Sequence, residues 1–212
     1  MQLFLFFFIF QTTLFAQGFK PDEIILAGGR SFYSFTFKNK VPADLLSYKY
    51  KNGFAYDARL SFALDDRSNL RFEMGAFQAG SKSIENSNLL NWNLNYMSFG
   101  THYLYKIIDK ERRLDFVVYA GPQLAISYLV SGQQSVNKLN YDLKESKAFK
   151  STNFHGGVIA GIRYFASLRV SLSMEYRFDM SFAQVEGEDH ANGQTTRNIG
   201  HQITFGIGFS LQ

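Results

Sequence analysis

The sequence predicts an all-β fold, an eight-stranded antiparallel up-and-down transmembrane β-barrel. Three observations predict it: one long stretch alternates between apolar and polar residues without a break, seven further segments have strand-like patterns, and the connections alternate between long and short. All three are typical of outer-membrane barrels, in which one face of each strand meets lipid and the other meets the lumen.

The longest regular pattern runs from Leu168 to Phe182, where every second residue is apolar. A period of two indicates a β-strand. Fifteen residues at roughly 3.3 Å each span about 50 Å, or about 38 Å when the strand tilts by about 40°. Such a strand is long enough to cross a bilayer.

The first seventeen residues, Met1–Gln17, have the apolar core and the small-residue ending of a secretory signal peptide. The stretch is too short for a membrane-spanning helix. The predicted organisation is therefore a signal peptide at 1–17 and an outer-membrane β-barrel domain at 18–212.

Three strands are expected in the first part of the barrel. Ile24–Phe37 opens it, and Gly28-Gly29 marks a point where the backbone bends or a neighbouring strand comes close. Gly53–Leu64 and Asn69–Gly80 alternate regularly and are joined by Asp65–Ser68, which predicts a hairpin.

The fourth segment, Leu89–Lys106, changes its apolar face midway. Its first apolar residues occupy even positions and its later ones odd positions, which predicts a β-bulge near Tyr96-Met97. The first set is Leu90, Trp92, Leu94 and Tyr96, and the second is Met97, Phe99, Tyr103 and Tyr105.

Four more segments complete the eight. Leu114–Val130 and Ile199–Leu211 alternate between apolar and small or polar residues, and Phe154–Phe165 is rich in glycine. Only Ala166-Ser167 separates this glycine-rich segment from Leu168–Phe182.

The connections predict the orientation of the barrel. Those after strands one, three, five and seven are long, and those between them are short. Outer-membrane barrels have long extracellular loops and short periplasmic turns, so both termini are expected in the periplasm. The long connections are Lys38–Asn52, Ser81–Asn88, Ser131–Asn153 and Ala183–Asn198; the short ones are Asp65–Ser68, Ile107–Arg113 and Ala166-Ser167.

Alternation alone also suits a secreted soluble barrel with its apolar face inward. The polar row, however, combines many Ser and Gly residues with a few charges of both signs, as a narrow lumen requires. The interior of eight strands is too narrow for the aromatic row, which therefore faces lipid.

A lumen charge network is the strongest candidate site. Buried charges need partners, so a network of ion pairs that fills the barrel is favoured over a selectivity lining or a proton path. Wide channels occur in barrels of about sixteen or more strands. The predicted inward charges are Asp57, Arg59, Arg71, Glu73, Arg163, Arg169, Glu175, Arg177 and Asp179.

No catalytic residue, cofactor or metal site is predicted. The four histidines have no metal-binding spacing, and the chain has no cysteine. A lipid-modifying enzyme would need a nucleophile and a base, for which Ser151 or Ser181 with His155 or His190 are the candidates, but no recognisable motif surrounds them.

The expected partners are outer-membrane lipid and lipopolysaccharide. The net charge of +4 is spread over the chain and forms no nucleic-acid-binding stripe. Lysines in the first and third long loops suit lipopolysaccharide phosphates or an acidic partner. These lysines are Lys38, Lys40, Lys49, Lys51, Lys138, Lys144, Lys147 and Lys150.

The chain resembles the outer membrane protein β-barrel domain family of Bacteroidota, the PorT-like group. The resembling segments are Phe15–Gln17, Tyr96–Tyr103, Val118–Leu124, the glycine-spaced sixth strand and Ile203–Phe209. The resemblance implies an eight-stranded barrel, and one branch of the family serves protein secretion and gliding. It implies the outer-membrane insertion machinery as a partner during assembly and secretion-complex proteins as further partners, and it carries over no catalytic residue.

The sequence therefore predicts a non-enzymatic integral outer-membrane barrel with a structural or interaction role, through its extracellular loops or as an accessory to a secretion or gliding complex. The alternatives are a narrow, porin-like solute channel and an outer-membrane lipid-modifying enzyme.

Overall fold

The computed structural model describes residues 20–38, 48–85, 88–109, 116–137, 139–187 and 195–211. The predicted signal peptide, Met1–Gln17, lies outside the described residues. Among the described residues, no helix is long and apolar enough to span a membrane.

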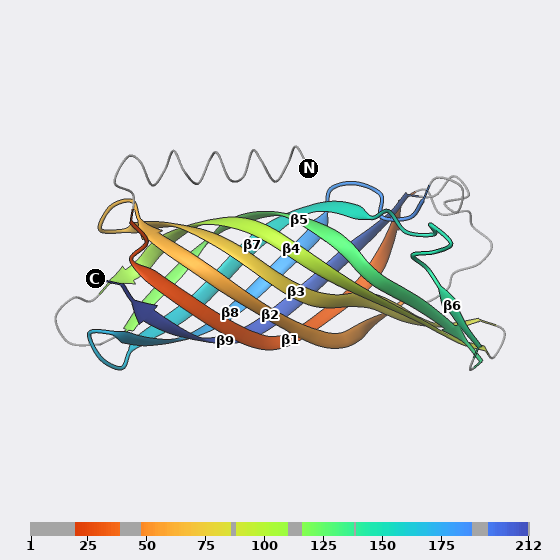
Figure 1. Ribbon diagram of the computed structural model, residues 1–212, viewed down its shortest axis with the longest axis horizontal. Helices are drawn as coiled ribbons and strands as arrows, with labels where there is room; N and C mark the ends of the chain where they lie inside the picture. The colour runs from red at the N-terminus through yellow and green to blue at the C-terminus, as the bar shows by residue number, and fades with distance from the viewer. Residues whose placement is uncertain are drawn as a thin grey trace.

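Eight long antiparallel strands close into a barrel, which confirms the predicted eight-stranded up-and-down transmembrane fold (Figure 1). The neighbours in order are β4, β3, β2, β1, β9, β8, β7 and β5, and β5 pairs with β4 to close the ring. A ninth strand, β6, pairs with the end of β5. The strands are β1 Glu23–Lys38, β2 Lys49–Ala63, β3 Ser68–Glu85, β4 Asn88–Asp109, β5 Phe116–Val136, β6 Leu139–Asp142, β7 Thr152–Phe165, β8 Val170–Ser181 and β9 Thr195–Ser210.

The barrel has two different ends. At the short-turn end, residues 64–67 join β2 to β3 and residues 166–169 join β7 to β8. The first and last strands also meet at this end, where the Leu211 N–H donates to the Asp22 carbonyl. The long-loop end is the opposite end, which carries β6 (Figure 1).

Strand β8 shows why the sequence folds with its apolar side outward. Every second side chain from Ser171 to Ser181 is buried in the lumen, while Leu172, Met174 and Tyr176 are exposed on the outer wall. Because a strand directs successive side chains to opposite faces, the apolar row of the sequence forms a wall that suits lipid.

The fourth strand corrects one prediction. Leu90, Trp92, Leu94 and Tyr96 all face inward, on the same side as His102. The register shift lies at the predicted height, between Asn95 and Tyr96, but the extra residue is Val130 of the partner strand β5. Strand β4 therefore does not reverse its faces, and its first apolar set is not on the lipid side.

These inward residues belong to an apolar cluster inside the long-loop end, which we call the mouth cluster. Phe35 of β1 stacks on Phe149, with ring centroids 5.6 Å apart, and meets Trp92 edge-on at 5.9 Å. Chain connections supply Leu143, Phe149 and Val185, so loop residues fold into the barrel and close its opening. The buried members are Tyr33, Phe35, Ala55, Phe77, Ala79, Leu90, Trp92, Leu94, Tyr96, Leu129, Leu143, Phe149 and Val185.

The connection predicted at Ser81–Asn88 is also different from the prediction. Strands β3 and β4 continue to Glu85 and Asn88, so only residues 86–87 separate them. Long and short connections therefore do not alternate strictly. The cross-strand apolar pairs Ile84–Leu89 and Leu90–Val136 continue the pairing of β3, β4 and β5 past the last pair of β5 with β7, and Figure 1 shows β6 on this protruding sheet.

The inward position of Trp92 predicts a fluorescence result, because it is the only tryptophan of the chain. Trp92 is 9% exposed, whereas Met97 is 42% exposed on the outer wall. In vesicles with brominated acyl chains, we expect little quenching of Trp92. A control with Trp92→Phe and Met97→Trp places the indole on the wall and is expected to be strongly quenched. Strong quenching of the native protein would place Trp92 in lipid and contradict the structure.

Candidate functional site: an ion network in the lumen

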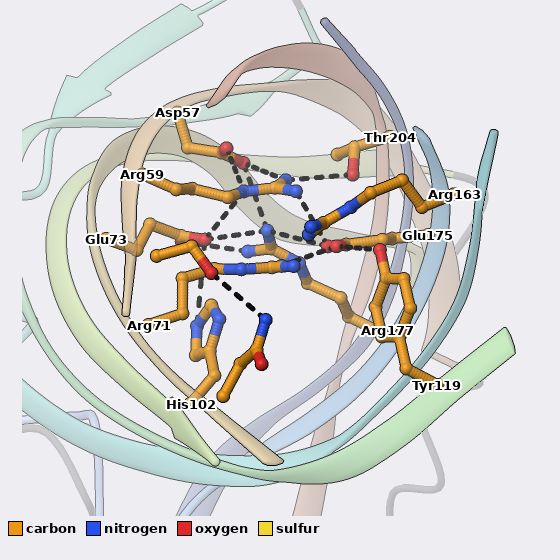
Figure 2. A network of polar contacts seen from close by, with 12 residues as sticks. Asp57, Arg59, Arg71, Glu73, His102, Tyr119, Arg163, Glu175, Arg177 and Thr204 are labelled. Atoms are coloured by element: carbon orange, nitrogen blue, oxygen red, sulfur yellow. Dashed lines mark hydrogen bonds and ion pairs between the residues drawn. The ribbon is translucent and has the colours of Figure 1, made fainter. Parts of the chain in front are cut away.

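Charged side chains from three strands meet in the middle of the lumen (Figure 2). Strand β2 supplies Asp57 and Arg59, β3 supplies Arg71 and Glu73, and β8 supplies Glu175 and Arg177. The two members of each pair are two residues apart in the sequence. Because alternate residues of a strand point to the same face, both members lie on the inner face. The β8 pair is separated from the β2 and β3 pairs by β1 and β9 in the sheet, so the network spans the lumen.

Glu175 is the most heavily shared carboxylate of the network. Its Oε1 atom lies 2.5 Å from Nη1 of Arg71, and its Oε2 atom lies 2.8 Å from Nη1 of Arg59. The hydroxyl of Tyr119 on β5 donates to Oε1 at 2.5 Å. With Arg177, whose Nη2 atom lies 3.3 Å from Oε2, three guanidinium groups and one hydroxyl converge on a carboxylate with no exposed side-chain surface.

Arg177 makes the opposite arrangement, in which one guanidinium serves several carboxylates. Its Nη2 atom lies 2.6 Å from Glu73 Oε2, 3.2 Å from Asp57 Oδ2 and 3.3 Å from Glu175 Oε2. Arg59 completes the set through Asp57, with 2.5 Å between Nε and Oδ1. The ion pairs of this centre thus join β2, β3 and β8.

A separate ion pair lies nearer the short-turn end. Arg163 Nη1 on β7 lies 2.7 Å from Glu23 Oε2 at the start of β1. The Ser171 hydroxyl donates to the same Glu23 carboxylate. The Arg163 guanidinium also lies 5.6 Å from the ring centre of Tyr119, which links this pair to the central network.

Asp179 forms a third group, on the side of the mouth cluster. It accepts a hydrogen bond from the Tyr33 hydroxyl and faces Nδ1 of His155 at 3.2 Å. The Gln202 amide nitrogen donates to the Tyr33 oxygen at 2.8 Å. Tyr33 belongs to both groups, because its ring stacks on Phe77 in the mouth cluster.

Glycines make room for the two tyrosines of the network. A Cβ atom at Gly200 would lie 2.3 Å from the Tyr33 ring, and one at Gly161 would lie 2.7 Å from the Tyr119 hydroxyl. These close approaches explain why glycine interrupts the polar row of β7 and β9 at these inward positions.

The structure places eight of the nine predicted charges in the lumen, and the prediction was wrong for Arg169. Arg169 precedes the first residue of β8 and is exposed in the turn 166–169. The alternation between inward and outward side chains applies only within the strand, so it does not determine where Arg169 points. The prediction also missed Glu23, which lies one residue before the predicted first strand. The network therefore contains four arginines and five carboxylates, in place of the predicted five and four.

Two further groups escaped the sequence analysis. His102, which lies 3.6 Å from Glu73, occupies an inward position of β4, but the sequence analysis considered it only as a metal ligand. Tyr33 and Tyr119 are aromatic residues, so the alternation of apolar and polar residues does not mark their hydroxyl groups as lumen donors.

The lumen has little free volume around these groups. A cavity of about 10 Å³ lies among residues that include Asp57, Glu73, His155 and Arg177. A second cavity of about 30 Å³ lies near Arg163. A single water needs roughly 10–15 Å³. These spaces suit one or two waters and not a solute.

The serine and histidine considered for an enzyme do not form an accessible site. His155 and Ser181 face each other across β7 and β8, but the Ser181 Oγ accepts a hydrogen bond from the Asn153 amide at 2.9 Å. Ser181 is fully buried. Ser151 is exposed in the segment before β7, and His190 lies outside the described residues.

Metal ligands do not gather in the part of the chain that the structure describes. No three of its His, Asp or Glu residues are arranged to hold an ion. The acidic groups of the lumen are instead occupied by arginines and hydroxyls.

The fold and the filled lumen define a class of protein, the small closed β-barrels of the outer-membrane type. Neisserial surface protein A is similar in structure, with a TM-score of 0.52 and 15% identity over 89% of this chain and 97% of that chain. The outer membrane protein OprG from Pseudomonas aeruginosa has a TM-score of 0.51 and 11% identity over 92% of this chain and 99% of that chain. At these identities the likeness concerns the fold alone.

Sequence comparison adds no closer relationship. No protein-family model matches the chain, and no curated protein matches it. The resemblance to the PorT-like group therefore stays a prediction.

Removing the shared carboxylate tests the importance of the network. Glu175→Gln leaves Arg59 and Arg71 without their common partner, and loss of one side of a buried pair costs about 3–5 kcal/mol. We expect this loss in urea unfolding of the micelle- or bilayer-inserted barrel, followed by Trp92 emission. The matched control Arg169→Gln lies in the exposed turn and is expected to change stability by less than about 0.5 kcal/mol. Equal unfolding midpoints for the two variants would contradict the network's role.

Proposed function

We propose that the protein is a non-enzymatic outer-membrane barrel that acts by binding another protein at its long-loop end, without passing solutes. The observation that carries the proposal is the closed interior. The ion network fills the middle of the lumen, and the mouth cluster closes its long-loop end. A barrel without a path through it has only its surfaces with which to act.

The protruding sheet at the long-loop end offers a binding surface. In the part of the chain that the structure describes, β6 pairs only with β5, so its second edge has no strand partner. All four residues of β6 are exposed, including Leu139 and Tyr141. An open strand edge with exposed apolar side chains pairs readily with an extended segment of another chain.

The turn beside this edge exposes charges of both signs, and its two lysines can bind acidic side chains of a partner segment. Lys144 and Lys147 are exposed in the turn that follows β6. That turn is held by Asp142, whose carboxylate accepts from the Glu145 and Lys144 N–H groups at 2.9 and 2.8 Å. These hydrogen bonds lower the pKa of Asp142 below its ordinary value. The lysines are thus presented beside β6 by a turn that stays ordered while Asp142 is ionised.

We propose an outer-membrane location with both termini in the periplasm. The apolar outer wall and the contact between Asp22 and Leu211 at the short-turn end support it. This orientation exposes the long-loop end to the cell exterior, beside lipopolysaccharide. The insertion machinery and the secretion-complex proteins implied by the resemblance stay predicted partners.

A closed lumen predicts the absence of channel activity. Purified barrel added to planar bilayers is expected to give no stepwise conductance, because a hydrated ion does not fit through the network. The variant Arg177→Ser tests the alternative of a solute channel. Stepwise conductance of the native barrel that this variant alters would show that ions pass along the network, and would contradict the proposal.

The proposed binding surface is tested with single cysteines, since the native chain has none. Tyr141→Cys is expected to react with an impermeant maleimide on intact cells. The matched Ser167→Cys in the β7–β8 turn is expected to react only after the outer membrane is permeabilised. A photo-crosslinker on Tyr141→Cys should give a protein adduct, and adding Asn140→Pro should abolish it, because proline disrupts strand pairing. Labelling of Ser167→Cys on intact cells would reverse the orientation, and an adduct unaffected by proline would exclude pairing with β6.

A further inference from the structure

A single arginine stands out on the apolar outer wall. Arg30 on β1 is exposed and faces outward, between the outward positions Gly28 and Phe32. Among the described residues, the outward positions of β8, β9, β1 and β2 include two arginines, Arg30 and Arg197, and no carboxylate. Arg197 lies six residues nearer the long-loop end of β9 than Ile203, the cross-strand partner of Arg30.

The Arg30 side chain is held against an aromatic ring. Its guanidinium lies over Phe54 of β2, 4.4 Å from the ring centre, and the two residues are direct cross-strand partners. A guanidinium stacked on a ring keeps its N–H edges free to bind an anion in its own plane. The ring therefore orients the charge without neutralising it.

An aromatic row lies next to Arg30 on its long-loop side. Tyr50, His201, Tyr176 and Phe178 reach across four strands, and His201 packs on the other three rings at centroid distances of 5.4–5.7 Å. His201 Nδ1 and the Tyr176 hydroxyl share a hydrogen bond of 2.5 Å. Rows of aromatic residues lie at the boundary between hydrocarbon and headgroups.

The position of Arg30 along the membrane normal determines which anions can reach it. His201 is the cross-strand partner of Phe32, so Arg30 lies two residues from His201 along β1, on the side of the short-turn end and of the hydrocarbon. A charge on a lipid-facing wall is costly at the midplane and less so near the boundary, and a long side chain extends toward the headgroups. The anionic groups at that level belong to lipids.

We propose that Arg30 is the centre of a lipid-binding site on the outer wall, which takes the phosphate of an anionic lipid in the leaflet on the long-loop side. The guanidinium binds two phosphate oxygens, Phe54 holds its plane, and the acyl chains lie along the apolar wall. The phosphate belongs either to a glycerophospholipid or to lipid A. This inference goes beyond the proposed function, and it rests only on the outer wall facing lipid.

Native mass spectrometry of the micelle-solubilised barrel tests the site. Phosphatidylglycerol, lipid A and zwitterionic phosphatidylcholine are added separately, and the retained lipid is counted. We expect at least one of the two anionic lipids to be retained in preference to phosphatidylcholine, and the preferred one identifies the source of the phosphate. Arg30→Gln is expected to lower this retention at least fivefold.

Two variants separate a site from a general effect of charge. Arg169→Gln removes the same charge at the opposite end and is expected to change retention less than twofold. Phe54→Leu keeps the charge but removes the ring, and is expected to give an intermediate loss. Equal retention by Arg30→Gln and the native protein would overturn the proposal, as would equal losses in Arg30→Gln and Arg169→Gln.

Folding is read independently of lipid retention. The heat-dependent gel shift of a folded barrel and its β-type circular dichroism are expected to be the same in all four proteins. If Arg30→Gln folds less well, Arg30→Lys is the decisive variant, because it keeps the charge. It should retain more anionic lipid than Arg30→Gln, and equal retention by these two variants would overturn the proposal. The conductance and crosslinking results do not depend on this outcome.

Discussion

The structure depends on neutralising charge in a lumen that is too narrow for bulk water. Eight strands enclose a space just wide enough for side chains. A charge placed there loses its hydration and needs partners from the opposite wall. Glu175 and Arg177 meet this need because each forms ion pairs with several opposite charges. The network therefore connects strands that are distant in the sequence and ties the two sides of the barrel together.

The lumen is filled in two ways along its length. Ion pairs occupy the middle, and aromatic rings with inserted loop residues occupy the long-loop end. Tyr33 joins the two regions, since its hydroxyl donates to Asp179 and its ring stacks on Phe77. Both fillings exclude solutes, which is why the surfaces of the barrel, and not its interior, carry the proposed activity.

The outer wall also carries few charges, and a charge there also needs a partner. It is apolar over most of its area, and the Arg30 guanidinium lies over Phe54 and beside an aromatic row. Inside the barrel an arginine is satisfied by carboxylates of the protein. On the described part of the wall no carboxylate faces Arg30, so the proposed partner is an anion of the surrounding lipid.

The sequence by itself determined the fold class, the strands and most of the lumen charges, because a strand has a strict period of two and one polar row must face inward. Leu168–Phe182 is the clearest case, as β8 follows the predicted alternation throughout. Only the tertiary structure decided which charges pair, because the partners of Glu175 come from β2 and β3, which face β8 across the lumen only when the ring closes. It also decided that Leu90, Trp92, Leu94 and Tyr96 face inward, since an apolar residue is equally stable against lipid and inside a closed mouth. Periodicity cannot distinguish these two environments, and it loses its meaning beyond a strand end, as at Arg169.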